Sequence, residues 1–252
     1  MPEKCPAPVR RLTWDSRFWG FPVAEYRSEK FSRRKIHQVL TWCQQRKVRC
    51  LYLFLPACNL AQHQGWLRQN RIRCVEKRIL LKRSLAHPSL SSMLLSGWGS
   101  LPKIQTPKDA DLKFLERAAF RMHRNTRFFK DRAFSEGKAA LLYSLWIRRD
   151  FKKNHVLVAL AGGKNRTPGA YISFEKLGAK VGRIGLLGVL PPFQGKGWGK
   201  QLTLAALQWL QQASCTRAFV TTQAENQAAL RLYLSAGFRQ YRIYVCFHRW
   251  FA

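Results

Sequence analysis

Residues 186–210 read LLGVLPPFQGKGWGKQLTLAALQWL and constrain the fold more than any other stretch. An apolar segment typical of a strand runs into two prolines, then into glycines at 195, 197 and 199, and then into a helix. Such a turn exposes backbone N–H groups at a helix N-terminus, where the macrodipole adds positive potential. Because the turn also carries Lys196 and Lys200 and no carboxylate, it predicts a site for an anionic, phosphate-bearing ligand.

Two familiar phosphate-binding motifs do not fit this turn. A dinucleotide fingerprint that starts at Gly195 needs a glycine where Lys200 stands, and a P-loop needs a glycine at Gln194 and Ser or Thr at Gln201. What remains is Q-x-x-G-x-G, from Gln194 to Gly199, between a strand and a helix. A plain strand-to-helix turn with convenient glycines is the structural alternative.

Composition indicates a folded, cytoplasmic protein. The 252 residues are 46% apolar, with nine Trp and sixteen Phe. No run approaches the length of a membrane span, and the N-terminal MPEKCPAPVRR lacks an apolar signal core. The seven cysteines include no C-x-x-C pair, so buried free thiols are expected rather than a disulfide framework. The six histidines are scattered without ligand pairing, which predicts that no metal is bound.

The formal net charge of +32 is spread over the whole chain rather than confined to a tail. Such a field concentrates anions near the protein and predicts nonspecific contact with nucleic acid or anionic membrane. It selects the sign of a partner, not its identity.

Residues 84–103, SLAHPSLSSMLLSGWGSLPK, are rich in Ser, Gly and Pro and are interpreted as a linker. Before them, residues 1–83 predict a small α/β domain in which 12–26 is extended, 33–47 and 59–70 are helices, and 50–56 and 74–85 are strands. After them, residues 104–252 predict helices at 107–122, 134–149, 197–213 and 226–236, and strands at 155–161, 168–176, 182–190, 216–222 and 238–250.

A second motif follows the glycine turn and shows what kind of turn it is. Residues 226–238 fit N-x-x-A-x-x-L-Y-x-x-x-G-F, from Asn226 through Tyr233 to Phe238. The two motifs, in this order and at this separation, resemble those of the GNAT family of acetyl-CoA-dependent N-acetyltransferases, over about residues 104–252. The resemblance implies an α/β fold of the α+β kind, with a mixed, twisted sheet whose central strands splay between flanking helices, here preceded by the smaller N-terminal domain.

The resemblance also implies how acetyl-CoA is held. The glycine turn would bind the pyrophosphate of CoA, and the splayed strand would pair with the amides of the pantetheine arm. A backbone N–H near Val189 or Leu190 would polarise the thioester carbonyl. Asn226 would contact the cofactor arm, cap the last helix, or do both. The predicted cofactor-binding residues are Leu187, Gly188, Val189, Leu190, Gln194, Gly195, Lys196, Gly197, Trp198, Gly199, Lys200 and Asn226.

Two residues are predicted to act on protons. Tyr233 stands where many GNAT enzymes place a tyrosine beside the CoA sulfur, so it is expected to be the general acid as the tetrahedral intermediate collapses. A core aromatic is its structural alternative, because Tyr233 shares a helical face with Ala229, Leu230 and Leu234. Glu175, on a strand near the site, is the expected general base, with a solvated surface glutamate as the alternative.

The remaining segments point to an acceptor. Residues 11–26, RLTWDSRFWGFPVAEY, and residues 123–134, HRNTRFFKDRAF, followed by LLYSLWIRR, are similar to segments of the bacterial TDP-fucosamine acetyltransferases, a group within this family. That resemblance implies acetylation of the 4-amino group of a nucleotide-linked deoxy sugar in surface-polysaccharide assembly. Arg127, Phe128 and Phe129 are the predicted substrate-binding residues, through a phosphate fork and stacking surface. Packing between helices is the alternative for the two phenylalanines.

Other functions stay open at this point. Asn125-Thr126 stands where Ser is usual in that group, and the charge is higher than a sugar acetyltransferase needs. A protein N-terminal or lysine acetyltransferase of the ribosomal-protein type is the first alternative, and a noncatalytic nucleic-acid-binding protein on a GNAT scaffold is the second. Dimers are common among GNAT proteins, so a homodimer is one expected assembly.

Overall fold

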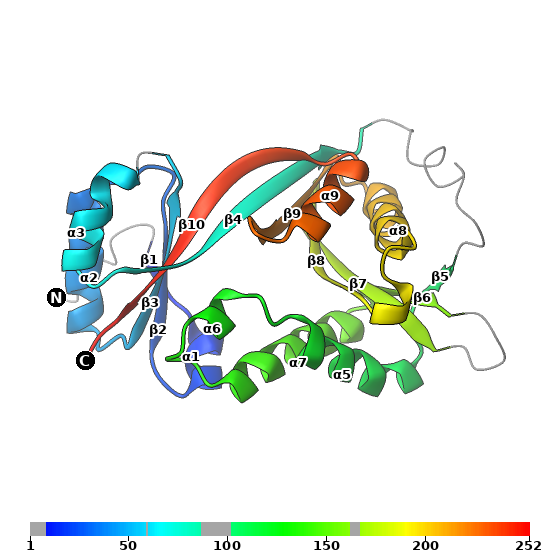
Figure 1. The fold of residues 1–252 in the computed structure, drawn as a ribbon, viewed down its shortest axis with the longest axis horizontal. Helices are drawn as coiled ribbons and strands as arrows, with labels where there is room; N and C mark the ends of the chain where they lie inside the picture. Colours follow the sequence, from blue (N-terminus) through cyan, green and yellow to red (C-terminus); the bar gives the residue numbers. More distant parts are fainter. Residues whose placement is uncertain (1–8, 59, 87–101, 162–166) are drawn as a thin grey trace. The chain divides into compact units, whose positions relative to one another are not determined.

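The computed structural model describes residues 9–58, 60–86, 102–161 and 167–252 (Figure 1). Its α-helices are α1 (Thr13–Trp19), α2 (Arg33–Gln45), α3 (Gln64–Gln69), α5 (Leu112–Met122), α6 (Arg127–Lys130), α7 (Glu136–Lys152), α8 (Trp198–Gln212) and α9 (Gln227–Ser235). Short 3-10 turns are η1 (Ala61–His63), η2 (Asp109–Asp111) and η3 (Pro191–Phe193). The strands are β1 (Val9–Arg11), β2 (Val23–Arg27), β3 (Cys50–Pro56), β4 (Arg73–Ser84), β5 (Lys103–Gln105), β6 (Val156–Leu160), β7 (Pro168–Leu177), β8 (Val181–Val189), β9 (Arg217–Gln223) and β10 (Arg239–Trp250).

The chain forms two compact units, and neither is continuous in sequence. Unit 1 comprises Met1–Ile79, Gln223–Glu225 and Arg242–Ala252, and unit 2 comprises Leu80–Thr222 and Asn226–Tyr241. Strands β4 and β10 therefore contribute residues to both units. The domain boundaries that the sequence predicts stay a prediction, and most of the expected linker at 84–103 lies outside the described residues.

Unit 1 is an α/β unit around β3. β3 pairs in parallel with β2 and antiparallel with β10, where Tyr244↔Pro56 and Trp250↔Cys50 mark the two ends of the ladder. Cys50–Leu55 are all buried, as expected of an apolar strand inside a sheet. Helix α2 turns one apolar face to this core, where Ile36, Val39, Leu40 and Cys43 are buried together with Phe247 from β10.

The prediction of extended structure throughout 12–26 is wrong for Thr13–Trp19, which form α1. The Ser16 hydroxyl donates to the Leu12 carbonyl at 2.7 Å and accepts from the Val23 N–H at 2.9 Å, so one side chain ties the helix to the strand that follows. Trp14 and Phe18 stack one turn apart, with ring centroids 5.3 Å from each other. Gly20, at φ 85°, then ends the helix in the left-handed region. These local contacts override the β propensity of the aromatic residues.

Unit 2 carries a mixed sheet in the order β4-β9-β8-β7-β6-β5. Strands β5 to β8 pair antiparallel, and β8 pairs in parallel with β9. Helices α5 and α7 lie on one side of β6–β8 and α8 lies on the other (Figure 1). Side chains of β7 alternate between the two sides, because Tyr171 contacts His123 at the end of α5 while Phe174 packs on Trp209 of α8.

The other predicted helices and strands are present, with bounds shifted by a few residues. The expectation of buried thiols is confirmed for Cys43, Cys50, Cys215 and Cys246 and is wrong for Cys58 and Cys74, which are exposed. Cys74 alternates outward near the start of β4. Along the described segments, no helix is both long and apolar enough to cross a bilayer.

Candidate active site

Strands β8 and β9 part at one end. Their ladder joins Val181–Arg183 to Arg217–Phe219, at the beginning of both strands. From Ile184 to Val189 the ladder partners of β8 lie on β7. The end of β8 is therefore unpaired along the edge that faces β9. This is the splay that the sequence motifs predict.

The backbone of the open end of β8 has a defined polarity. The Leu190 N–H donates to the Gly169 carbonyl of β7 at 2.9 Å. In an antiparallel ladder successive residues point their N–H and C=O groups to opposite sides, so those of Val189 and Leu187 point away from β7. Of the two N–H groups predicted to polarise a thioester, that of Leu190 is engaged within the sheet and that of Val189 faces the open side.

A β-bulge lies just before this end. Phe174↔Ile184 is followed by Ile172↔Leu187, so two β8 residues oppose the single residue Ser173. The Ser173 hydroxyl accepts the Leu186 N–H at 2.9 Å. A Cβ at Gly185 would lie 2.5 Å from that hydroxyl, which explains the glycine. Bulges bend a strand and increase its twist, so this one turns β8 away from β9.

The glycine turn leaves the start of α8 uncapped. Gly195 has φ 73° and Gly197 has φ 78°, both in the left-handed region that favours glycine. Gly197 is the N-cap and has no side chain to bond the first turn. The first backbone bond of the helix runs from the Gln201 N–H to the Gly197 carbonyl, so the N–H groups of Trp198, Gly199 and Lys200 have no intrahelical acceptor. This is a cradle of donors suited to an anion.

Two contacts bring the turn and the open strand end together. The Gln194 side chain donates from Nε2 to the Val189 carbonyl at 2.8 Å. A Cβ at Gly199 would lie 2.5 Å from Leu232 Cδ1 and 3.5 Å from Val189 Cγ2, so α8, α9 and β8 meet at this glycine. The predicted set Leu187–Leu190 and Gln194–Lys200 is therefore one local cluster.

The side chains of the turn divide between solvent and packing. Lys196 is exposed and Lys200 half-buried, so both amines can reach a bound anion. Trp198 stacks on Phe193 with centroids 4.4 Å apart, and both rings cover Gly169. The Trp198 side chain thus packs the turn against Gly169 of β7, while its backbone N–H remains among the free donors at the start of α8.

Asn226 caps α9, because its Oδ1 accepts the Ala229 N–H at 3.1 Å. The structural alternative for Asn226 is confirmed, and its contact with a cofactor stays a prediction.

Tyr233 follows Leu232 on α9, and its side chain is 4% exposed. Its ring meets Phe238 edge-on at 5.8 Å. Burial raises the pKa of the Tyr233 phenol, so the phenol is protonated at neutral pH.

Glu175 does not lie with these residues. It pairs with Arg183, in register and by an ion pair, at the closed end of the β8–β9 ladder. Glu175 is five positions along β7 from Ala170, which is opposite Val189, and a strand rises about 3.3 Å per residue. Glu175 is therefore about 16 Å from the open end, and its alternative as a surface glutamate fits the structure better than the role of general base.

The predicted substrate-binding residues form the short helix α6. Phe128 is 2% exposed and packs edge-on against Phe134 at 5.4 Å, so helix packing describes it well. The Arg127 guanidinium lies 4.5 Å from the Phe128 ring centroid, and Phe129 stacks on Tyr143 at 6.5 Å. Phe129 and Arg127 are half-buried, and their contact with a substrate stays a prediction.

A tyrosine and a histidine that sequence reasoning missed adjoin the open end of β8. Tyr171 is opposite Gly188, where a Cβ would lie 2.5 Å from the Tyr171 ring. The Tyr171 hydroxyl lies 2.7 Å from Nε2 of His123. Burial lowers the pKa of His123 to about 4 and raises that of Tyr171, so both are neutral at pH 7. The glycine in a strand pattern was the available signal, since it marks a close approach of neighbouring atoms.

The cluster can hold an anion at α8, hydrogen-bond an extended arm along β8 and present a protonated phenol from α9. Among the described residues, no group of three or more His, Cys, Asp or Glu side chains is placed to hold a metal ion. These are the parts that transfer of an acyl group from a phosphate-bearing thioester requires.

Comparison with known proteins supports this interpretation. The model of the acetyltransferase (GNAT) family matches residues 115–238. The chain is also 32% identical over 237 residues to the dTDP-fucosamine acetyltransferase of Escherichia coli O6:H1, covering 92% of this chain and 93% of that protein. The chain belongs to the GNAT family of acetyltransferases, whose acyl donor is acetyl-CoA. The predicted family, fold class and acyl donor are thereby confirmed at the level of the family.

Further relatives match only part of the chain or show only the fold. The mycothiol acetyltransferase of Renibacterium salmoninarum is 39% identical over 61 residues, which cover 24% of this chain and 18% of that protein. The GCN5-related N-acetyltransferase from Sphaerobacter thermophilus has a TM-score of 0.61 at 16% identity, over 96% of this chain and 76% of that one. A tandem GNAT protein from the clavulanic acid biosynthesis pathway has a TM-score of 0.59 at 13% identity, over 92% of this chain and 76% of that one.

Proposed function

We propose that this protein transfers an acetyl group from acetyl-CoA to a primary amine, the 4-amino group of a nucleotide-linked deoxy sugar. The open end of β8 beside the uncapped start of α8 is the observation that supports acyl transfer. The sugar acceptor rests on the likeness to dTDP-fucosamine acetyltransferase, which extends over 92% of the chain. The short matches to mycothiol acetyltransferases do not extend far enough to compete with it.

The residues of the cluster fit acetyl-CoA. Gly195 has open space where a Cβ would stand, so a phosphate group can approach the backbone there. The N–H groups of Trp198, Gly199 and Lys200 would hold the diphosphate, with Lys196 and Lys200 adding charge. The backbone of Leu187 and Val189 would bond the arm, since it points away from β7. Acetyl-CoA supplies an activated thioester at the end of that arm.

Two groups of the chain then act on the reacting atoms. The Val189 N–H donates to the thioester oxygen as negative charge develops there. The Tyr233 phenol donates a hydrogen bond to the sulfur as the C–S bond breaks. The departing thiolate takes up its proton as protons equilibrate with water, and the phenol stays protonated because burial raises its pKa. The amine must arrive unprotonated, and the proton that it loses after attack passes to water. Because the pKa of His123 is about 4, its imidazole is too weak a base to take that proton efficiently at neutral pH.

The test is a comparison of acceptors at fixed acetyl-CoA. Release of the free CoA thiol is measured with TDP-4-amino-4,6-dideoxygalactose, with the same sugar nucleotide carrying a 4-hydroxyl, and with peptides that begin with the N-terminal sequences of ribosomal proteins. We expect acceptor-dependent release with the 4-amino sugar alone, and a product heavier by one acetyl group. Release stimulated by the peptides and not by the amino sugar would instead establish a protein acetyltransferase. Release with the 4-hydroxyl sugar would contradict transfer to nitrogen.

A further inference from the structure

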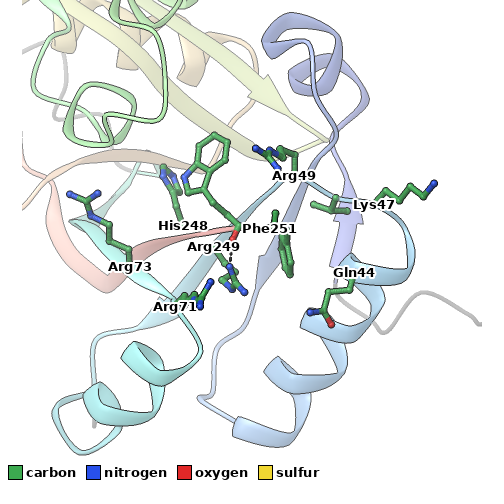
Figure 2. Close-up of a pocket in the computed structure, with 11 residues that line it drawn as sticks. Gln44, Lys47, Arg49, Arg71, Arg73, His248, Arg249 and Phe251 are labelled. Atoms are coloured by element: carbon green, nitrogen blue, oxygen red, sulfur yellow. Dashed lines mark hydrogen bonds between the residues drawn. The ribbon is translucent and has the colours of Figure 1, made fainter.

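Unit 1 contains a cavity of about 690 Å³ that none of the features above requires. Its lining comes from the turn between α2 and β3, the turn between α3 and β4, and the end of β10 (Figure 2). Five basic side chains contribute to that lining, namely Lys47, Arg49, Arg71, Arg73 and Arg249. Among the lining residues, all of which the structure describes, no side chain is acidic.

The local fold fixes the two turns that carry these cations. Lys47, at φ 52°, and Arg71, at φ 53°, each adopt the left-handed conformation directly after a helix. Both helices end with the backbone hydrogen bond typical of that conformation. The Val48 N–H donates to the Cys43 carbonyl at 2.9 Å, and the Ile72 N–H donates to the Leu67 carbonyl at 2.9 Å. Glycine or asparagine is the usual residue at such a position, so basic residues stand there against the local backbone preference.

The guanidinium groups of Arg71 and Arg249 lie side by side in the cavity (Figure 2). Burial, and then the charge of Arg71, lowers the pKa of Arg249, so the two cations repel each other in the absence of a counter-charge. Arg249 donates one hydrogen bond to the Trp250 carbonyl, while its Nε is buried without a partner among the described residues. An anion placed between the two groups would satisfy this donor and remove the repulsion.

Helix ends give a structural alternative, because cations are favourable at helix C-termini. A helix end carries about half a negative charge, which acts within the last turn. Two such ends amount to about one negative charge against the five positive side chains of the lining. The excess of positive charge therefore remains after this alternative is counted.

Size and aromatic content indicate the kind of anion. The volume lies within the range of about 300–1,000 Å³ that is usual for small-molecule sites. Trp250 and Phe251 line the cavity beside the arginines. The guanidinium carbon of Arg249 lies 4.7 Å from the centroid of the Phe251 ring. Arginine forks recognise phosphate oxygens, and an indole face can stack on a base. We propose that this cavity of unit 1 binds a nucleoside diphosphate, with the diphosphate between Arg71 and Arg249 and the base against Trp250.

The test uses the full chain saturated with CoA, so that the acyl-donor site of unit 2 is filled. Thymidine 5′-diphosphate and inorganic pyrophosphate are titrated by calorimetry into the wild-type protein and into Arg71→Gln and Arg249→Gln. We expect a nucleotide site that binds pyrophosphate more weakly and whose Kd increases about tenfold or more in each variant, as loss of a charge-assisted hydrogen bond implies. Lys35→Gln, an exposed cation near the other end of α2, is the matched control and should leave Kd unchanged.

Three results would overturn the inference. They are the absence of binding at millimolar nucleotide, a Kd that neither arginine variant changes, and tight binding of a single-stranded RNA oligomer by a protein that does not bind the mononucleotide. The inference does not depend on the proposed function. If nucleotide binds with a Kd that the unit 1 variants leave unchanged, while acetyl transfer to the amino sugar proceeds, then the nucleotide site is elsewhere and the proposed function stands.

Discussion

At the scale of single residues, Tyr233 combines burial with an available donor. Its side chain is 4% exposed. Burial raises its pKa, so the phenol is protonated wherever the enzyme works near neutrality. A phenol of this kind can donate to a sulfur that gains negative charge in the transition state.

Tyr233→Phe should therefore lower kcat by roughly 100-fold, which is the lower end of the contribution of a positioned general acid. The Kd for acetyl-CoA should change by less than about threefold, because the ring remains and the cradle at α8 is untouched. Turnover and equilibrium binding are measured separately for this comparison. Tyr241→Phe, on an exposed tyrosine of the same unit, is the control. Equal losses in kcat and in affinity would assign Tyr233 to packing alone.

His123 predicts how stability depends on pH. Its pKa is lowered from 6.5 to about 4 in the folded protein. Between these two pH values the unfolded chain binds a proton at His123 and the folded chain does not. Stability from this group is complete above about pH 6.5 and is lost as the pH falls towards 4. For a partly buried group we expect a loss of about 1–2 kcal/mol at pH 5.

His123→Gln keeps a polar partner for the Tyr171 hydroxyl and removes the titration. Between pH 7 and pH 5, its denaturant midpoint should fall less than that of the wild-type protein. His37→Gln, on an exposed histidine of α2, should follow the wild-type curve. The same slope for His123→Gln and the wild-type protein would show that His123 does not contribute to acid sensitivity.

Site residues whose type and spacing form a motif can be predicted from the sequence. Site residues that only tertiary contacts bring together cannot. The turn from Gln194 to Lys200 and the position of Tyr233 were predictable, because each belongs to a pattern of fixed spacing. Tyr171 and His123 were not, since 48 positions separate them and their contact exists only once β7 packs against the end of α5. Glu175 was misplaced for a related reason: it is on the expected strand but at the opposite end, and register decides which end faces the site.

At the scale of elements, the β8–turn–α8 segment positions the site. The bulge at Ser173 turns β8, and two left-handed glycines then redirect the chain so that α8 begins without a cap. Glycine patterns predicted the turn, but the bulge depends on a register shift that no spacing in the sequence reveals. In the same way α1 was missed, because Ser16 stabilises it through a bond to Val23 of the next strand.

Gly195 and Gly178 form a matched pair for testing the turn. Both have a left-handed φ, 73° and 66°, and open space where a Cβ would stand. Alanine should cost about 1 kcal/mol of stability at either position, because the backbone strain is the same. Gly195→Ala should also raise the Kd for acetyl-CoA at least tenfold, since the methyl group would occupy the approach to the cradle. Gly178→Ala, in the β7–β8 hairpin, should leave that Kd unchanged, and equal Kd values in the two variants would place the diphosphate elsewhere.

At the scale of the whole molecule, the two units share their strands. The chain's last residues return to unit 1, where Val245, Phe247 and Phe251 join the core, and where β10 pairs with β3 from Tyr244 to Trp250. The sequence predicted β10 correctly as an element but placed it wholly within a domain of residues 104–252. A strand that belongs to two units has one continuous hydrophobic pattern in the sequence. Composition alone therefore does not reveal the unit boundary inside it.

A chain that ends at Tyr241 tests this arrangement. It retains every described strand of unit 2 up to the unit boundary. It loses Val245, Phe247 and Phe251 from the core of unit 1, and removal of a buried phenylalanine side chain costs about 3–5 kcal/mol. Because a small unit is stable by only about 5–15 kcal/mol, this loss is enough to unfold unit 1. Hydrogen exchange should then become fast in β2 and β3 and stay slow in β7 and β8. Acetyl-CoA should still slow exchange further in β8 and α8, since its proposed contacts lie within unit 2. Slow exchange in β3 of the shortened chain would show that unit 1 holds its core without β10, and the boundary predicted after residue 83 would then describe it better than the contacts of the last strand do.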